Sequence, residues 1–435
     1  MTYGQGEPLQ PLIYREALLM ANLPRFALTI GAAALIAGCG APQPPMAAPG
    51  AMPQLRPIAS RASTPGYRVV YQFQRSAQGD FAAAPLLDVS GKLYGTTKYG
   101  GADYLGVVYR VSTGGVERVL HSFAGGSDGQ EPAAGLLNVN GMLYGTTTHA
   151  GSGGCGTVYS ISKRGDEKVL YGFRGSEHGF DGCDPEAPLI EVGGTLYGTT
   201  YSGGHSGGTV FSVTTKGVEK VLYRFSRHNG EGRNPYGGLV EVKGMLYGTT
   251  EFGGGGCRGS GCGTVYRISK TGEEKVLYKF RAGSSDGAFP IGGLVNVDDT
   301  LYGTTNEGGS DACNKSCGTV YSITTHGREK VLYYFNRSDG ARPHAGLIDV
   351  NDTLYGTTEL GGTGSDCLFG RNSHCGTVFS LSISGMEQVL HSFAGGSDGG
   401  NPVASLIDVN GTLYGTTALE GGRGGGISTV FAVSP

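Results

Sequence analysis

The chain has 435 residues and a net charge of −3, so it lacks the strong basic excess that favours nucleic-acid binding. Its 81 glycines do not recur at every third position, which excludes a collagen-like rod. Hydrophobic residues make up 38% of the chain, enough for a packed core made of short strands. We therefore expect a globular, turn-rich protein with no nucleic-acid partner.

The first 38 residues predict an export signal. A short apolar run follows Arg25 and ends in Ile36-Ala37-Gly38-Cys39, which resembles the bacterial lipobox. The run is too short to span a bilayer. We expect residues 1–38 to be a lipoprotein signal peptide, with Met20 as an alternative start, and Cys39 to carry the lipid. An ordinary signal peptide with a chance cysteine is the alternative.

The segment after the signal predicts a tether. Residues 39–65 are rich in proline and alanine and lack a hydrophobic period. The residue after Cys39 is Gly40 and not Asp, which by resemblance to known sorting signals favours the outer membrane. We therefore expect an exported protein, anchored by its lipid in the outer membrane or at the cell surface of a bacterium.

Residues 66–435 contain a tandem repeat. Leu-Tyr-Gly-Thr-Thr occurs seven times, at intervals of 50 to 59 residues. Repeats near this length that hold several short strands predict a β-propeller. The copies begin at Leu93, Leu143, Leu196, Leu246, Leu301, Leu354 and Leu413.

Each repeat predicts four short strands, which we call a to d from the axis outward. In the second repeat they span 136–139, 143–147, 157–161 and 169–173, and Asn140-Gly141 predicts a tight hairpin turn between a and b. The spacing within a–b and c–d is constant, so the length variation lies in the b–c and d–a connections. These leave the same face of a propeller, and variable loops on one face often mark a binding surface.

The two ends of the repeat array are incomplete. Residues 69–73 resemble a d strand without a preceding c strand, and residues 429–433 resemble a c strand without a following d strand. Pairing these two segments would close the ring and remove its free edge. The predicted fold is therefore an all-β, seven-bladed propeller of four-stranded blades, closed by its N- and C-terminal strands, and we expect a monomer.

The repeats resemble bacterial choice-of-anchor tandem repeat proteins of the GloVer type. The resemblance rests on Gly-Thr-Val-Phe near Leu-Tyr-Gly-Thr-Thr, matched fully at Gly208–Phe211 and Gly376–Phe379 and with Tyr for Phe in three further copies. The first and last copies depart from it, at Gly106–Tyr109 and Ser428–Phe431. The resemblance implies one repeat domain attached to a surface by different anchors, and it implies no activity.

Eight cysteines fall within the repeats, mostly in b–c connections. Their repeat positions favour four disulfides, which the oxidising surroundings of an exported protein permit. Zinc is the alternative, but each candidate pair lies in a different blade. The predicted pairs are Cys155–Cys183, Cys257–Cys262, Cys313–Cys317 and Cys367–Cys375.

Several polar side chains fall in or near the variable loops. Asp-Gly turns in the d–a connections could place a ring of carboxylates on a ligand face, but capping of each turn by its own Asp is the favoured interpretation. We expect the scattered loop histidines, His149 and His344 among them, to be solvated, and the Glu-Lys pairs of strand d, such as Glu167-Lys168, to form a solvated outer edge. The candidate ligand residues are Asp128, Asp181, Asp286, Asp339 and Asp398.

No motif for a catalytic centre, a cofactor or a metal ion is found, so none is predicted. We expect a surface-displayed, lipid-anchored propeller that acts as a non-enzymatic binding or scaffold module through its b–c and d–a loops, with an unknown protein or glycan as ligand. Two alternatives stay open. One is an enzyme on extracellular polysaccharide, which would need paired carboxylates at the channel mouth; the other is a structural envelope protein.

Overall fold

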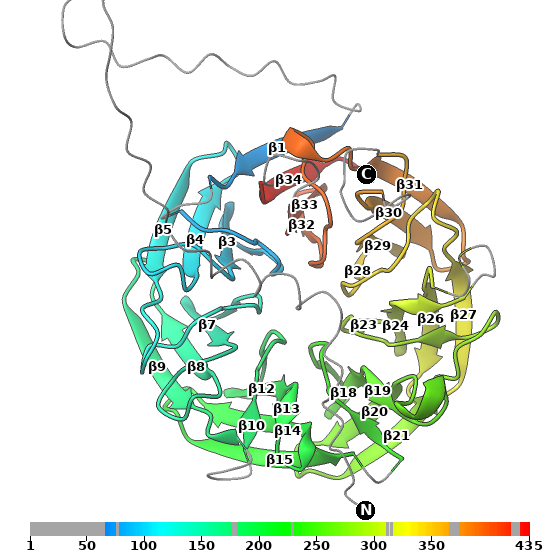
Figure 1. The fold of residues 1–435 in the computed structure, drawn as a ribbon, viewed down its shortest axis with the longest axis horizontal. Helices are drawn as coiled ribbons and strands as arrows, with labels where there is room; N and C mark the ends of the chain where they lie inside the picture. The colour runs from blue at the N-terminus through cyan, green and yellow to red at the C-terminus, as the bar shows by residue number, and fades with distance from the viewer. Residues whose placement is uncertain are drawn as a thin grey trace, which may run out of the picture. The chain divides into compact units, whose positions relative to one another are not determined.

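The computed structural model describes residues 66–74, 78–175, 181–227, 230–309, 313, 316–364, 374–418 and 427–435. This part of the chain forms seven four-stranded antiparallel sheets arranged around a central axis (Figure 1). The predicted all-β, seven-bladed propeller is therefore confirmed. None of the described helices is long and apolar enough to cross a membrane. The expected signal peptide, Cys39 and the tether lie outside the described residues.

Six blades consist of four strands in the hydrogen-bonded order a-b-c-d. The strands of the first three blades are β2 (Leu87–Val89), β3 (Lys92–Thr97), β4 (Val107–Ser112) and β5 (Glu117–Ser122); β6 (Leu137–Val139), β7 (Met142–Thr147), β8 (Thr157–Ile161) and β9 (Glu167–Gly172); β11 (Ile190–Val192), β12 (Thr195–Thr200), β14 (Ser206–Thr214) and β15 (Glu219–Ser226). Those of the next three are β17 (Val240–Val242), β18 (Met245–Thr250), β20 (Thr264–Ser269) and β21 (Glu274–Lys279); β23 (Val295–Val297), β24 (Thr300–Thr305), β26 (Thr319–Thr324) and β27 (Glu329–Tyr334); β28 (Ile348–Val350), β29 (Thr353–Thr358), β30 (Thr377–Ser382) and β31 (Glu387–Ser392).

The seventh blade joins the two ends of the propeller. Its inner strands are β32 (Ile407–Val409), β33 (Thr412–Thr417) and β34 (Thr429–Val433), and its outer strand is β1 (Tyr67–Gln72). β1 pairs antiparallel with β34, with Tyr67 opposite Val433 and Gln72 opposite Thr429. The expected closure of the ring is confirmed.

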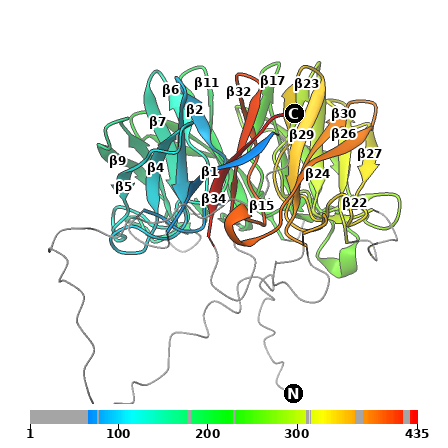
Figure 2. The ribbon, with the colours of Figure 1, turned by 90° about the horizontal axis from the view of Figure 1, so that it is seen from above.

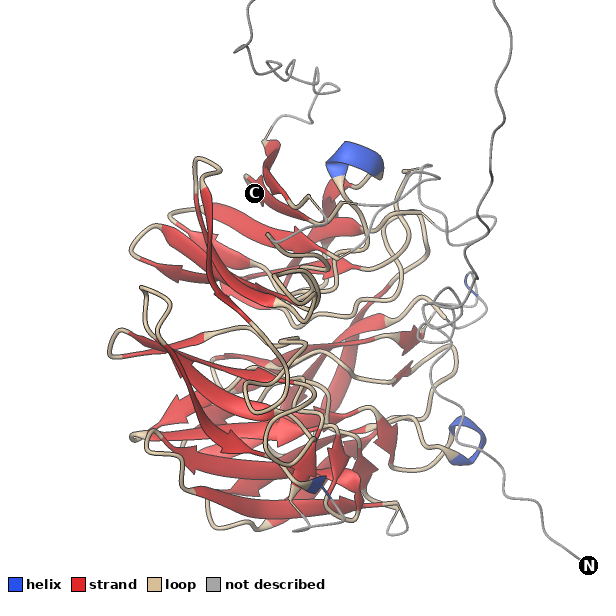
Figure 3. Cartoon of the chain, turned by 60° about the vertical axis from the view of Figure 1, so that its left-hand side comes forward, coloured by secondary structure: helices blue, strands red, loops and turns tan. Residues whose placement is uncertain are grey.

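The b–c and d–a connections leave one end of the propeller, the lower end in Figure 2, which we call the loop face. Three two-stranded pairs link a d–a to a b–c connection there: β10 (Gly182–Cys183) with β13 (Ser202–Gly203), β16 (Gly232–Arg233) with β19 (Phe252–Gly253), and β22 (Gly287–Ala288) with β25 (Glu307–Gly308). The single-turn helices η2 (Cys257–Gly259) and η4 (Gly396–Asp398) also belong to these loops, outside the strands drawn in red in Figure 3.

The Leu-Tyr-Gly-Thr-Thr motif forms the last five residues of every b strand. All seven leucines are fully buried, and the tyrosines are 2–9% exposed. The glycine admits the aromatic ring of strand c: a Cβ at Gly95 would lie 2.6 Å from Tyr109 Oη, and one at Gly415 2.5 Å from Phe431 Cζ. No larger residue fits there without displacing that ring.

The two threonines of the motif connect strands and blades. The first donates to a carbonyl of the next blade in six of the seven copies; for example, Thr304 Oγ1 lies 2.9 Å from Ala345 O. The second shares a hydrogen bond with a threonine of strand c in six copies, as in Thr147 with Thr157 at 2.8 Å. These threonines thus link strands b and c within six blades and join six blades to the next one.

The hydrophobic cores lie between adjacent blades. One cluster combines Val108 and Phe123 of the first blade with Leu143 and Tyr159 of the second, and Phe123 packs edge-on against Tyr159 at 5.3 Å. A single blade therefore cannot bury its own apolar surface, which explains why the array must be complete.

Two details differ from the sequence-based expectations. Strand d of the second blade begins at Glu167, two residues earlier than predicted. The Glu-Lys pairs are not uniformly solvated: Lys168 is exposed, but Glu167 is half-buried and its Oε1 atom is buried. The acidic residue turns toward the neighbouring blade because strand d runs along the junction between blades.

Candidate functional site

On the loop face, the d–a connections have the same backbone arrangement in every blade. Each d–a connection has, at an equivalent position, a non-glycine residue with φ between 53° and 60°. Its carbonyl accepts the N–H of the residue that follows Leu-Tyr-Gly-Thr-Thr, as in Tyr201 N to Asp184 O at 2.9 Å. The seven residues at this equivalent position are Phe81, Glu131, Asp184, Asn234, Phe289, Arg342 and Asn401.

The side chains on this constant backbone differ from blade to blade. Tyr236 and His344 come from d–a connections two blades apart, yet their rings are 5.4 Å apart, so these side chains converge toward the axis. The convergence creates one asymmetric set of polar side chains, which we call the axial rim. Its members are Lys98, Glu131, His149, Asp184, Glu186, Tyr201, Tyr236, Glu251 and His344.

One side of the axial rim is a chain of alternating charges. Glu131 Oε2 lies 3.4 Å from both Lys98 Nζ and His149 Nδ1, and His149 Nε2 lies 3.7 Å from Asp184 Oδ1. The interaction of the His149 ring with the accepting carboxylate of Glu131, against the opposing effect of burial, raises the pKa of His149. Burial would raise the pKa of Glu131, but His149 and Lys98 lower it below its ordinary value. The side chain of His149 is 44% exposed, so it is partly solvated as expected, but it also takes part in these ion pairs, which the sequence did not predict.

The other side of the axial rim combines aromatic rings with two acids. Tyr201 Oη donates to Glu251 Oε2 at 2.8 Å, and Glu186 is hydrogen-bonded to Tyr236. Burial, with a smaller contribution from the charge of Glu186, raises the pKa of Glu251 to about 7. Burial also lowers the pKa of His344 to about 4, which corrects the expectation that this histidine is solvated.

A shallow groove of about 390 Å³ lies beside the axial rim in the fourth blade. Arg233 connects the two, because its guanidinium donates to Asn234 Oδ1 at 3.3 Å and Asn234 Nδ2 donates to Tyr201 O at 3.0 Å. Arg233 also lies 5.0 Å from the centre of the Phe252 ring. The groove is lined by Arg227, Gly230, Glu231, Arg233, Gly253, Gly254, Gly255, Gly256, Gly259, Ser260 and Gly261.

The axial rim and the groove together offer aromatic faces, carboxylates and guanidinium groups. This combination suits a polar ligand with hydroxyl or carboxylate groups, because the rings supply contact area and the charged groups supply directional hydrogen bonds. A carboxyl group with a pKa near 7, as on Glu251, is also able to exchange a proton at neutral pH.

The five predicted Asp residues do not share a ligand surface. Each lies in its own d–a turn, accepts a backbone N–H of that turn and contacts the Tyr or His of strand d at a blade junction. Asp339, for example, accepts Asn336 N at 3.0 Å and Tyr333 Oη at 2.7 Å. The equivalent contacts are made by Asp128, Asp181, Asp286 and Asp398. The turn-capping interpretation fits these contacts, while the ligand-face interpretation does not.

The predicted cysteine pairs cross-link the connections of the loop face. The structure forms Cys155–Cys183, Cys257–Cys262 and Cys313–Cys317. Cys375 is also disulfide-bonded, and its predicted partner Cys367 lies outside the described residues. The carbonyl of Cys155 accepts the N–H of Asp184 at 3.2 Å, so the first staple directly supports the axial rim.

Most rim residues were not predicted from the sequence. Glu186, Tyr236 and His344 each follow a proline in the d–a connection, where other repeats carry Ala133, Ile291 or Val403. The residue type at this position varies among otherwise regular repeats, and this variation is the sequence feature that could have identified these rim residues. Similarly, His121 and His391 replace the tyrosine that the five other d strands carry, at Tyr71, Tyr171, Tyr223, Tyr278 and Tyr333.

Known proteins resemble the chain mainly through its fold. A europium-containing methanol dehydrogenase aligns with a TM-score of 0.45 and 11% identity, over 84% of this chain and 93% of that one. A Mycobacterium tuberculosis puromycin-hydrolyzing peptidase aligns with a TM-score of 0.50 and 10% identity, over 83% of this chain but 53% of that one. At these identities the second match supports the propeller fold alone. None of the curated proteins compared matches in sequence.

The repeats match a family model described as the Gloeobacter/Verrucomicrobia repeat. Three overlapping matches cover residues 58–207, 119–315 and 310–435, which include the whole propeller. They confirm the resemblance to GloVer repeat proteins, since the matched residues contain all seven copies of the motif. The chain therefore belongs to the Gloeobacter/Verrucomicrobia repeat family.

Proposed function

We propose that this protein is a non-enzymatic binding module that holds a glycan at the axial rim of its loop face. The observation that carries the proposal is the contrast between a backbone repeated in all seven blades and rim side chains that differ among them. Structural repetition alone would favour equivalent side chains, so the asymmetric set points to recognition. Disulfide staples support binding as well, because a rigid loop loses less entropy when a ligand binds.

The rim chemistry favours a saccharide. Tyr201, Tyr236 and His344 present rings that can stack on the apolar faces of sugars, and Glu186, Glu251 and Arg233 can bond to sugar hydroxyl or carboxylate groups. The groove beside Arg233 would accommodate a second part of the same chain.

A glycan array probed with the full-length protein tests the proposal. We expect binding to a restricted set of saccharides, and loss of about 2 kcal/mol, roughly thirtyfold in Kd, on Tyr236→Ala or Arg233→Ala. Lys216→Ala is the matched control, because Lys216 is exposed in the c–d turn on the opposite face. Binding that survives both rim changes, or that fails with Lys216→Ala, would contradict the proposal. Capture of proteins but no glycan would also contradict it.

A second candidate function is hydrolysis of an extracellular polysaccharide. The specific observation in its favour is the interacting pair Glu186 and Glu251, in which Glu251 has a pKa of about 7. Incubation with the saccharides that bind, followed by measurement of reducing ends, separates the two functions. Release by the wild type that disappears in Glu251→Gln supports hydrolysis; tight binding without release supports the binding module.

We further propose that lipid on Cys39 anchors the propeller at the outer membrane or cell surface. The lipobox-like sequence and the tether support this location. Cys39→Ser should move the protein from the membrane fraction to the soluble fraction without changing its glycan binding. Membrane retention of Cys39→Ser would show that the anchor lies elsewhere. We also expect the detached protein to be a monomer in light scattering.

A further inference from the structure

The junctions between blades repeat a contact among three side chains. A Tyr or His near the end of one d strand meets a carboxylate of the following d–a turn and the glutamate that opens the next d strand. In the fifth junction these residues are Tyr333, Asp339 and Glu387, with Tyr333 Oη 2.7 Å from Asp339 Oδ2 and 3.4 Å from Glu387 Oε2. A phenol hydroxyl in this place serves as a hydrogen-bond donor to both acids.

The junction between the first and second blades is chemically different. His121 of β5 takes the place of the tyrosine, beside Asp128 of the d–a turn and Glu167 at the start of β9. His121 Nε2 lies 3.2 Å from each Asp128 carboxylate oxygen. Potential ligand atoms of all three side chains lie within 4.8 Å of one another, and no other set among the described residues meets this condition.

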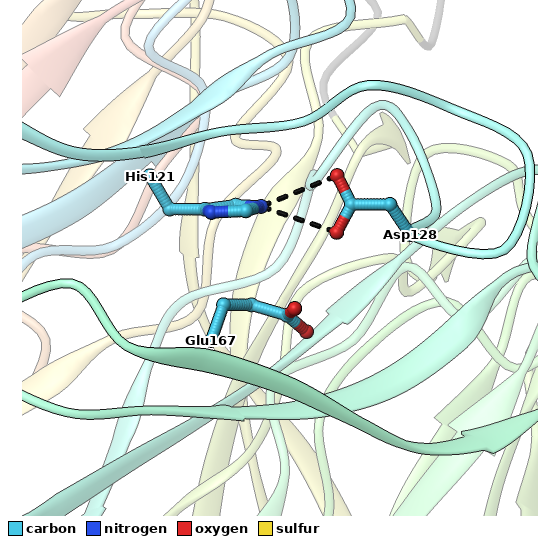
Figure 4. Close-up of side chains that lie close together, drawn as sticks. All are labelled: His121, Asp128 and Glu167. Atoms are coloured by element: carbon cyan, nitrogen blue, oxygen red, sulfur yellow. Dashed lines mark hydrogen bonds and ion pairs between the residues drawn. The ribbon is translucent and has the colours of Figure 1, made fainter.

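The three side chains point toward a common space (Figure 4). The Glu167 Oε1 atom is buried and accepts no hydrogen bond, as is true of the equivalent glutamate at the other junctions that have one, so the histidine is what distinguishes this junction. The side chains of His121 and Asp128 are 21% and 20% exposed, so an ion could reach them from solvent. The carboxyl groups of Asp128 and Glu167 offer oxygens within 4.8 Å of each other, and a cation between them would offset the repulsion between two ionised carboxylates.

We propose that His121, Asp128 and Glu167 bind a divalent transition-metal ion of the Zn²⁺ type. Two oxygens at about 2.1 Å and one nitrogen at about 2.0 Å from the ion would form three corners of a tetrahedral site with adjacent ligands roughly 3.3 Å apart. The separation of His121 from Asp128 already matches this value. An imidazole ligand favours Zn²⁺ over Ca²⁺, which prefers oxygen ligands alone. Water would complete the coordination.

The other junctions lack one of these ligands. Tyrosine replaces histidine at five of them, as at Tyr171, and a neutral phenol is a poor ligand for such an ion. The second histidine, His391, bonds to Asp398, but Tyr67 stands where the other junctions have glutamate. None of the three proposed ligands belongs to the axial rim, so the proposal does not rest on glycan binding.

Calorimetric titration of the metal-free, full-length protein with Zn²⁺ tests the site, and elemental analysis after dialysis gives the stoichiometry. We expect one Zn²⁺ per chain. His121→Tyr should abolish that equivalent while preserving the fold, because it restores the residue of the other junctions. Glu167→Gln should weaken binding at least tenfold, because it removes a charged ligand. His391→Tyr is the matched control and should still bind one Zn²⁺ per chain.

Two results would overturn the proposal. One is a wild-type protein that takes up no Zn²⁺ at micromolar concentration. The other is one Zn²⁺ per chain that still binds to both His121→Tyr and Glu167→Gln, since the ion would then lie elsewhere. Circular dichroism and thermal unfolding of each variant distinguish loss of the site from loss of the fold, and the glycan array checks separately that ligand binding at the rim is unchanged.

Discussion

Thr304 and Thr199 occupy the same position of the repeated motif but have different surroundings. Thr304 Oγ1 donates to the carbonyl of Ala345 in the next blade at 2.9 Å. Thr199 Oγ1 is equally buried but has no hydrogen-bond partner. A buried hydroxyl without a partner retains the cost of leaving water, so the two threonines should contribute to stability with opposite sign.

We expect Thr304→Val to lower the free energy of unfolding by about 1–2 kcal/mol, because it removes the bond and leaves a carbonyl unsatisfied. Thr199→Val, of nearly the same shape, should leave stability unchanged or raise it slightly. Urea denaturation of both variants measures the difference. Equal losses would mean that the hydroxyl bond between blades contributes little.

The connecting loops show how one covalent element supports the site. The Cys155–Cys183 disulfide spans 28 residues and links a b–c connection to the following d–a connection, whereas Cys257–Cys262 spans only 5 residues within one loop. A cross-link restricts the unfolded chain more when it closes a longer loop. The longer staple also carries the Cys155 carbonyl that holds Asp184 of the axial rim.

We expect Cys155→Ser/Cys183→Ser to lose about 3.5 kcal/mol of stability, against about 2 kcal/mol for Cys257→Ser/Cys262→Ser, on the loop-entropy estimate. Thermal unfolding of the two double variants shows which of them loses more stability. The first variant should also bind glycan more weakly, because it loosens the rim. A larger loss from the shorter staple would contradict the loop-entropy explanation.

At the scale of the whole ring, acidic pairs recur between blades. Burial first, and then the neighbouring carboxylate, raises the pKa of Glu219, Glu274, Glu329 and Glu387 to about 7. For Glu274 the neighbours are Glu231, which raises the pKa further, and Tyr223 and Lys279, which lower it. Because the folded pKa exceeds the ordinary value of 4.5, the folded state binds more protons than the unfolded state between these pH values.

This raised pKa predicts a pH dependence of stability. The contribution of these glutamates to the free energy of unfolding is fully present below pH 4.5 and is lost as the pH rises through about 7. Glu274→Gln mimics the protonated form, so its Tm relative to the wild type should increase from pH 5 to pH 8. Thermal unfolding across this range measures the trend. Lys216→Ala is the control, and its Tm difference from the wild type should not change with pH. A difference that does not change with pH would show that the junction carboxylates titrate normally.

Local sequence determined the blades and their number. Each strand and hairpin depends on contacts within one repeat, and the motif places leucine, glycine and threonine at the positions that packing and hydrogen bonding require. Because the repeats are nearly equivalent, constant spacing also predicted the loop face, the closing strand and the cysteine pairs. Strand d was misjudged at Glu167, since burial there depends on the neighbouring blade and not on its own repeat.

Only the tertiary structure decided which polar residues meet. Tyr236 and His344 are more than a hundred residues apart in the chain, and they touch because ring closure points their d–a connections toward one axis. His121 and Glu167 meet because adjacent d strands share a junction. A repeat pattern specifies what recurs in each blade, whereas the axial rim and the proposed metal site depend on residues that do not recur. Their proximity is a property of the closed ring, which no single repeat contains.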